Sequence, residues 1–237
     1  MAKATSSHAP PGNRLLARMT PADFKRLLPQ LKAVHLETDQ ILQKVHLPAE
    51  FAYFPTRSAT SFLRIMESGS TIEVGTVGNE GMVGVGGALG LPPSPHQVIA
   101  QVAGEALRIE TRALAAEVDR SSSFRHLMVN YQAAFQAQVW QSAACNGLHP
   151  IGQRCCRWLL MTHDRVGADV LPLTHEYLGY MLGVRRASVT DVLISLRDRD
   201  LIQYSRGSIT VLDRKGLETA ACECYKAVND EYDRLLS

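Results

Sequence analysis

The fold of this chain is decided by residues 171–212, which read LPLTHEYLGYMLGVRRASVTDVLISLRDRDLIQYSRGSITVL. Thr174 can cap a helix, and the apolar residues that follow it have the spacing of one helix face: Tyr177, Leu178, Met181 and Leu182. Gly183 stands where the chain must leave that helix, and a second apolar face then begins, made of Val189, Val192, Leu193 and Leu196. The pattern predicts a helix-turn-helix.

A β-hairpin is predicted directly after the second helix. Two short runs, Leu201–Tyr204 and Ser208–Leu212, flank the turn signal Ser205-Arg206-Gly207. A helix-turn-helix followed by a hairpin is a winged helix, with Arg206 at the tip of the wing.

The N-terminal end of the second helix is expected to contact DNA. In a helix-turn-helix this end lies in the major groove, and a guanidinium can form two parallel hydrogen bonds to a guanine edge or a phosphate. Helix-turn-helix patterns also occur in proteins that do not bind DNA, but the glycine turn, the paired arginines and the wing together favour DNA binding. The predicted DNA-binding residues are Thr174, His175, Arg185, Arg186, Ser188, Thr190 and Arg206.

Upstream, residues 31–109 have the pattern of an antiparallel β roll. Short apolar or alternating runs separated by glycine and proline are typical of β-sandwiches and barrels. The runs are Leu31–Leu36, Phe51–Phe54, Thr60–Met66, Thr71–Val77, Met82–Val85, Val98–Val102 and Ala106–Ile109. A short helix is predicted before them, starting at Thr20-Pro21 and ending near Leu28.

A long helix is predicted between the roll and the winged helix. Residues 111–146 contain neither glycine nor proline, and apolar side chains recur at helical spacing at Phe124, Leu127, Met128, Tyr131, Phe135 and Val139. A single apolar seam on a long helix needs a partner, and we interpret it as a dimer interface with a second copy. The alternative is that the seam packs onto the roll of its own chain.

These elements predict an α+β protein with a jelly-roll-like β roll, a dimerisation helix and a C-terminal winged helix. The expected division is a flexible leader at 1–19, a sensor domain at 20–120, the dimerisation helix at 121–147 and the DNA-binding domain at 148–237.

Composition sets outer limits on the class of protein. With 237 residues, 46% hydrophobic and 20% charged, the chain is not a disordered tail. Apolar runs such as Trp158–Met161 are too short to span a membrane, and the N-terminus lacks a secretory h-region, so we expect a cytoplasmic protein without a membrane partner. Five cysteines, an odd number, suit a reducing compartment. A net charge of +2 does not identify a nucleic-acid binder by itself.

From about Leu28 to Ser237 the sequence resembles the Crp/Fnr family of bacterial transcription regulators. The match is carried by Thr174–Gly179, Leu182–Arg186 and Val189-Thr190. The resemblance implies a cyclic-nucleotide-binding-like roll and a homodimer on a pseudo-palindromic double-stranded DNA operator. It places Arg186 where the family has a base-reading arginine, and RNA polymerase is a further candidate partner. Ala187 and Asp191 depart from the family's glutamate and arginine, which predicts a different operator.

The same resemblance argues against cyclic AMP as effector. The family's ribose-binding glutamate is replaced by Met82 in Gly81-Met82-Val83-Gly84, and Ser94 and Pro95 occupy the positions of its phosphate-binding Arg-Ser pair. A buried phosphate without that arginine loses a charge-assisted hydrogen bond. Glu80 is interpreted as a solvated turn carboxylate rather than a substitute ligand.

Other cofactors are judged from cysteine and histidine positions. No cysteine precedes Cys145, which argues against the iron–sulfur cluster of oxygen-sensing relatives. We predict no metal site, because Cys155-Cys156 are adjacent and Cys222-x-Cys224 has no second ligand pair nearby. Redox sensing by Cys155 or Cys156 stays open. Haem also stays open, with eight histidines as potential ligands: His8, His35, His46, His96, His126, His149, His163 and His175.

Three functional hypotheses follow. The first is a dimeric DNA-binding regulator with an effector other than cyclic AMP, and the second is a regulator that binds DNA constitutively. The third is a cupin-like enzyme, but His35, His46 and His96 lack the spacing of a metal-binding catalytic cluster, so we expect no enzyme.

Overall fold

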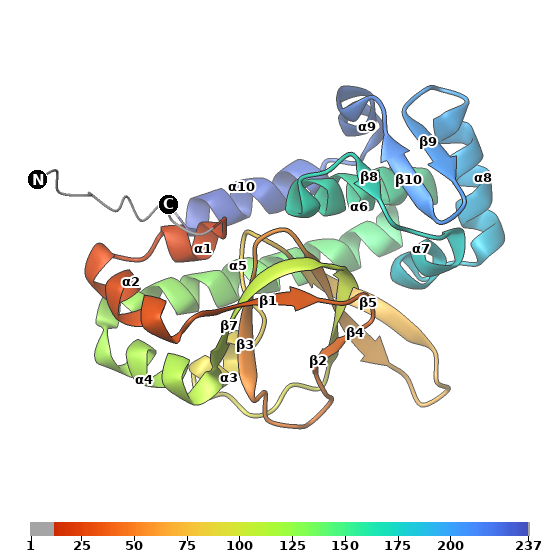
Figure 1. Cartoon of the computed structure of the whole chain (residues 1–237). Helices are drawn as coiled ribbons and strands as arrows, with labels where there is room; N and C mark the ends of the chain where they lie inside the picture. The colour runs from red at the N-terminus through yellow and green to blue at the C-terminus, as the bar shows by residue number, and fades with distance from the viewer. Residues whose placement is uncertain (1–11, 237) are drawn as a thin grey trace, which may run out of the picture.

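The computed structural model describes residues 12–236. In chain order it contains a β roll, a long helix and a winged-helix domain, which confirms the predicted α+β fold (Figure 1). Most of the predicted leader, including His8, lies outside the described residues.

The roll consists of two antiparallel sheets. One has the strand order β1-β7-β3 and the other β2-β6-β4-β5. Leu36, Phe54 and Val98 are fully buried in the core of the roll. The strands are β1 (Lys32–Leu36), β2 (Ile41–Gln43), β3 (Phe51–Pro55), β4 (Ala59–Ile65), β5 (Thr71–Val77), β6 (Gln97–Val102) and β7 (Gly104–Glu110).

The strand predicted at Met82–Val85 is wrong, and β2 was not predicted. Only Val83 is extended against a neighbour, exchanging backbone hydrogen bonds with Tyr53 at 3.1 and 2.8 Å. Gly84 then adopts a φ of +93°, which turns the chain out of the extended conformation and into the short helix α3 (Val85–Ala88).

Residues 12–19 are part of the folded roll rather than of a flexible leader. They contain the short helix α1 (Arg14–Ala17), whose Leu15 and Leu16 are buried. The Asn13 amide caps this helix and donates to the carbonyls of Pro55 and Gly81 at 2.9 and 2.8 Å, which joins the segment to the roll. The predicted short helix follows as α2 (Pro21–Leu27), with a 3-10 turn, η1, at Leu28–Gln30.

Two helices link the roll to the C-terminal domain. They are α4 (Thr111–Arg120) and the long helix α5 (Ser122–Leu148), separated by extended backbone at Ser121, whose hydroxyl accepts from the Phe124 amide at 3.3 Å. The helix α5 continues one residue past the predicted end at 147.

The C-terminal domain begins with α6 (Ile151–Val166) and β8 (Val170–Leu171). The predicted motif follows as α7 (His175–Leu182), α8 (Arg186–Arg197), β9 (Ile202–Ser205) and β10 (Ser208–Val211), and the strand order is β8-β10-β9.

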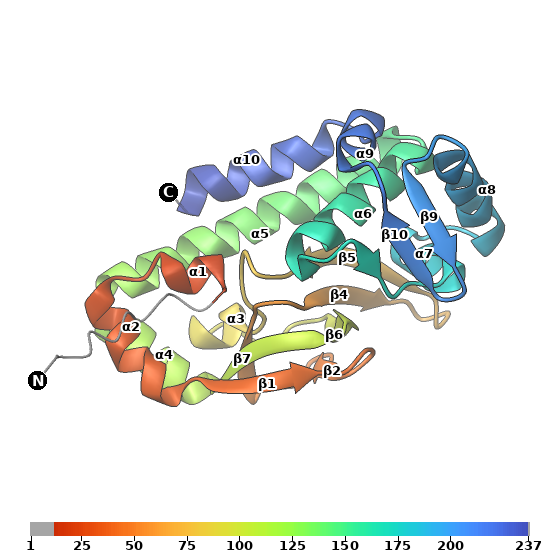
Figure 2. The ribbon, with the colours of Figure 1, turned by 45° about the horizontal axis from the view of Figure 1, so that its top comes forward.

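The last helices bring the chain back toward the roll. They are α9 (Arg214–Ala220) and α10 (Cys224–Leu236), and α10 lies alongside α5 (Figure 2). Tyr232 and Leu236 of α10 belong to the core cluster of the roll, so the end of the predicted 148–237 domain packs on the sensor part. Within residues 12–236, none of the helices combines the length and apolarity needed to cross a membrane.

Candidate nucleic-acid interface

A tight turn fixes α8 relative to α7. The Thr174 hydroxyl caps α7 by accepting from the Tyr177 amide at 3.1 Å. Gly183 ends the helix with a φ of +65°, a conformation that L side chains rarely adopt. The two helices share one core, in which Leu178, Val189 and Leu193 are fully buried.

The start of α8 faces solvent. Arg185, Arg186 and Ala187 are exposed and Ser188 is half-buried. The helix lies at the outer edge of the domain, away from the roll (Figure 1). Its first turn is therefore not covered by its own chain, as a groove-binding helix requires.

Three arginines on this side of the domain carry charge without an acidic partner. None of the ion pairs within residues 12–236 involves Arg185, Arg186 or Arg206. Arg206 lies at the exposed turn between β9 and β10, where Gly207 has a φ of +82°. Unpaired arginines at a helix start and a wing tip form an electropositive surface suited to phosphates and guanine edges.

Two predicted DNA contacts are already engaged within the domain. The Thr190 hydroxyl donates to the Arg186 carbonyl at 3.1 Å and lies 3.0 Å from His175 Nδ1. His175 Nδ1 must then carry the proton, because the threonine oxygen is left as acceptor. Burial, and secondarily the charge of Arg186, lowers the pKa of His175, so the ring is neutral at neutral pH. These two side chains hold α7 and α8 together at this surface and add no charge to it.

The wing is held against the end of α8 by one aromatic side chain. Arg197 donates to the Tyr204 hydroxyl at 3.1 Å and its guanidinium lies 5.5 Å from the ring centroid. The ring of His175 meets the same tyrosine edge-on at 5.1 Å. Tyr204 therefore links α7, α8 and the wing into one surface.

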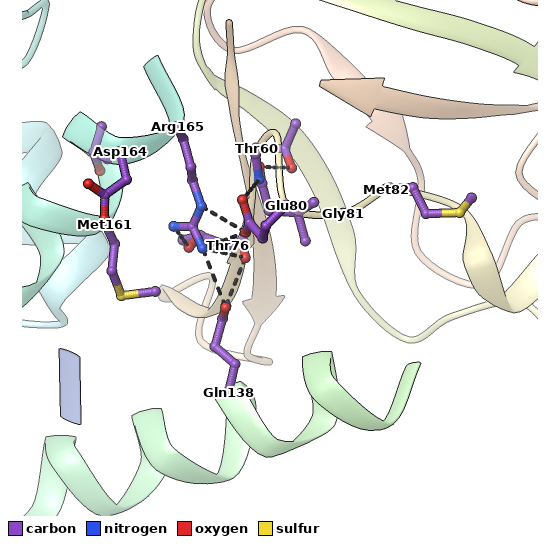
Figure 3. A network of polar contacts seen from close by, with 12 residues as sticks. Thr60, Thr76, Glu80, Gly81, Met82, Gln138, Met161, Asp164 and Arg165 are labelled. Atoms are coloured by element: carbon purple, nitrogen blue, oxygen red, sulfur yellow. Dashed lines mark hydrogen bonds and ion pairs between the residues drawn. The ribbon is translucent and has the colours of Figure 1, made fainter. Parts of the chain in front are cut away.

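A buried ion pair joins the C-terminal domain to the roll (Figure 3). Arg165 of α6 donates to Glu80 Oε1 from Nε at 2.9 Å and from Nη2 at 2.7 Å. It also donates to both the hydroxyl and the carbonyl of Thr76. The two side chains are only 5% and 9% exposed. The interpretation of Glu80 as a solvated carboxylate is wrong, because the fold places an arginine from α6 over the turn.

Gly78 and Gln138 complete this contact. An added Cβ at Gly78 would lie 2.2 Å from the Arg165 side chain, so only glycine leaves room for the arginine. Gln138 of α5 donates to the Thr76 carbonyl at 2.7 Å. The roll, α5 and α6 therefore meet at one polar junction.

A second, half-buried carboxylate lies on the same boundary. Glu73 of β5 accepts from Ser61 at 2.6 Å, from Gln101 at 3.0 Å and from the Trp158 indole of α6 at 2.9 Å. Burial raises the pKa of Glu73 to about 7, although the hydrogen bonds from Ser61 and Trp158 act in the opposite direction.

The roll contains a large cavity lined by the positions that the resemblance aligns with the family's cyclic-AMP-binding residues. The cavity has a volume of about 1020 Å³ and is lined by Met82, Ser94 and Pro95, and by Tyr131 and Phe135 of α5. The Tyr131 hydroxyl donates to the Met82 carbonyl at 2.7 Å, which connects the cavity wall to the long helix. The lining is mostly apolar, and its charged residues are Arg112, Glu50 and Glu110.

The residues predicted for a dimer interface are covered by their own chain. Buried side chains of this seam belong to the core of the roll, and Leu127 and Val139 pack against that core. The alternative interpretation was therefore correct, because helical periodicity reports that a face is covered but not by which element. The residues concerned are Phe124, Leu127, Met128, Tyr131, Phe135 and Val139.

A group of potential metal ligands was missed by sequence reasoning. Cys145 and His149 come together with Cys222 and Cys224, 73 or more positions later in the chain. The signal was the i, i+4 spacing of Cys145 and His149, which places both side chains on one face of a helix. The second ligand pair is close to Cys222 in space but distant from it in the sequence.

Comparisons with known proteins agree with this architecture. Residues 153–220 match the family of Crp-like helix-turn-helix domains. No curated protein sequence matches the chain.

Solved structures share the fold over most of the chain. A protein from Eubacterium rectale ATCC 33656 assigned to the Crp/Fnr regulators has 19% identity and a TM-score of 0.66, covering 87% of this chain and 96% of its own. A CRP-family transcriptional regulator from Thermus thermophilus has 19% identity and a TM-score of 0.64, with 79% and 96% covered. The c-di-GMP-responsive global regulator CLP from Xanthomonas campestris has 14% identity and a TM-score of 0.62, with 81% and 99% covered.

Proposed function

We propose, for a chain that has the Crp/Fnr fold and a Crp-like helix-turn-helix domain, that this protein is a homodimeric, sequence-specific transcription regulator. The observation that carries the proposal is the exposed first turn of α8 with its unpaired arginines. The partner is a pseudo-palindromic double-stranded DNA operator, and RNA polymerase is a further candidate. No catalytic activity is proposed.

The residues at the surface divide into two roles. Arg186 reads base edges and Arg185 binds base edges or phosphates, because both are exposed and uncompensated at the start of the recognition helix. Arg206 and the N-terminal end of α7 contact the phosphate backbone, which positions the domain. Asp191, exposed one turn further along α8, can accept from a cytosine amino group.

Dimerisation is proposed through the face of α5 opposite the buried seam. The exposed residues on this face are spaced alternately four and three positions apart, which is the repeat of a coiled-coil seam. They are Val129, Ala133, Gln136, Trp140, Ala143 and Gly147. Val129 is 49% and Trp140 is 65% exposed. The Trp140 indole is exposed to water, and the small alanine and glycine residues near it on α5 leave room for a second α5 to approach closely.

Sedimentation equilibrium of the wild type and Trp140→Glu tests this interface. A dimer is expected for the wild type, and a charge at the seam should make the variant monomeric. Met66→Glu, at a position between β4 and β5 that is also exposed, is the control and should stay dimeric. A monomeric wild type would contradict the homodimer.

We propose that cyclic AMP is not the effector. Met82 and Pro95 line the cavity where the family holds cyclic AMP, so titration calorimetry is expected to show no cyclic AMP binding. An apolar ligand that fills the cavity can act on α5 through Tyr131. Otherwise the protein binds DNA constitutively, and its operator affinity should not change after exhaustive dialysis or oxidation.

Selection from a pool of random duplexes tests the function directly. The protein should enrich one inverted repeat, with an affinity that falls steeply with salt because phosphate contacts release counterions. Failure to enrich any sequence at low salt would overturn the proposal.

A further inference from the structure

Four potential metal ligands meet where α5 ends and α10 begins. Cys145 lies in the last turns of α5 and His149 directly after it, while Cys222 and Cys224 flank the start of α10. Their sulfur and ring-nitrogen atoms all lie within 4.8 Å of one another. The Cys145 and Cys222 sulfurs are 3.5 Å apart, and Cys224 Sγ is 3.5 Å from His149 Nδ1. We refer to these four residues as the Cys/His cluster.

We propose that the Cys/His cluster binds a single Zn²⁺-type ion. A tetrahedral zinc with Zn–S bonds of about 2.3 Å has ligand atoms separated by about 3.8 Å, close to the spacing seen here. Three cysteines and one histidine are a common donor set for structural zinc. An iron–sulfur cluster would need its ligands farther apart, because several metal atoms lie between them.

Neighbouring side chains orient the ligands in the way metal sites require. His149 Nε2 lies 3.2 Å from Glu223 Oε1, so Nε2–H donates a hydrogen bond to the carboxylate and Nδ1 is left with a lone pair to bind metal. The Gln141 amide donates to Cys224 Sγ at 3.0 Å, which stabilises a thiolate. The cluster thus has a second layer of hydrogen bonds.

The local charge also points to an anionic group. Arg154 and Arg157 of α6 are buried, and their hydrogen-bond partners are neutral. Arg154 donates to Asn146 and to the Leu182 carbonyl, and Arg157 donates to Ser142 and the Met161 sulfur. Three thiolates around a divalent ion leave one negative charge beside these guanidiniums, which offsets the cost of burying them.

The site lies where it would connect two helices. It ties the beginning of α10 to the end of α5, at the junction from which the winged-helix domain continues through α6. The far end of α10 packs Tyr232 against Tyr131 of α5, 6.5 Å between ring centroids. A bound ion would therefore hold α10 along α5 from one end to the other.

Metal analysis of the full-length, reduced protein tests the proposal. Mass spectrometry of the purified protein should find one zinc per chain, released by a thiol-blocking mercurial. After exchange, Co²⁺ should bind one per chain with the d–d absorption of a tetrahedral site and thiolate charge-transfer bands.

Variants locate the site. Cys222→Ala and Cys224→Ala should each remove the tetrahedral Co²⁺ spectrum. Cys155→Ala, a fully buried cysteine outside the cluster, should keep it. Glu223→Gln should weaken Co²⁺ binding by about 10- to 100-fold, as for other carboxylates that orient a ligating histidine.

Several results would overturn the proposal. They are an octahedral Co²⁺ spectrum, absence of metal uptake by the reduced wild type, and equal loss of binding in Cys155→Ala. A Cys145–Cys222 disulfide in the native protein, with no metal uptake after reduction, would also contradict it. The wild-type spectrum decides the question even if the variants misfold, and DNA binding plays no part in the result.

Discussion

The winged-helix surface and the boundary between α6 and the roll handle charge in opposite ways. On the first, Arg185, Arg186 and Arg206 are exposed and have no acidic partner among the described residues. On the second, Glu80 and Arg165 are buried together, and Glu73 is enclosed by hydrogen-bond donors. We propose that the unpaired surface charge serves an external partner, whereas the paired buried charge holds two parts of one chain in place. Substitutions in the two regions should therefore separate DNA affinity from stability.

The largest effect is expected at the buried ion pair. Glu80→Gln leaves the Arg165 guanidinium buried without its carboxylate, which should lower the free energy of unfolding by about 3–5 kcal/mol. Denaturant titration measures this loss. Asp230→Asn, which breaks the exposed Lys226 pair, should cost no more than about 0.5 kcal/mol. Equal effects of the two variants would show that the buried pair contributes no more to stability than an exposed one.

Glu73 should make stability depend on pH. Its pKa rises from 4.5 to about 7 on folding, so the native state binds more protons between these values and stability falls as pH rises through them. The difference between these two pKa values corresponds to a loss of up to about 3 kcal/mol. In Glu73→Gln, the free energy of unfolding should no longer fall by this amount between pH 4.5 and 7. Parallel curves for wild type and variant would show that the carboxyl titrates normally.

Arg186→Ala should affect DNA affinity and leave stability unchanged. Loss of a bidentate base contact is expected to weaken binding to the selected operator by about 1–3 kcal/mol and to relax preference at one base pair per half-site. Fluorescence anisotropy measures the affinity, and a repeated selection from random duplexes measures the base-pair preference. Lys25→Ala, which removes an exposed charge on α2, is the matched control and should bind like the wild type. An unchanged operator preference would refute the role of Arg186.

The smallest effect is expected at the wing. Arg206→Ala should weaken binding to all sequences alike and reduce the slope of log affinity against log salt by about 1 per subunit. A change in sequence preference without a change in slope would instead mean that the wing reads bases.

The same contrast explains which features the sequence could predict. The winged helix was predicted closely because its turn glycine, its cap and its apolar faces are neighbours in the chain, from Thr174 to Val211. Local chemistry was sufficient there.

Features that depend on distant contacts could not be predicted in this way. Glu80 gave no sign of a partner 85 positions away, and Cys145 gave none of Cys222. The apolar seam of α5 was recognised correctly as covered, but the covering element could be identified only from the fold.

We propose that two copies of α8, related by a two-fold axis, enter successive major grooves on one side of the duplex. Half-site spacing measures this directly. Operators with half-site centres about 10 base pairs, or roughly 34 Å, apart should bind tightly. An insertion of about five base pairs, half a helical turn, between the half-sites rotates one to the opposite face, and affinity should then fall to that of unrelated DNA. Affinity that is insensitive to this insertion would contradict binding by two α8 helices in a fixed two-fold arrangement.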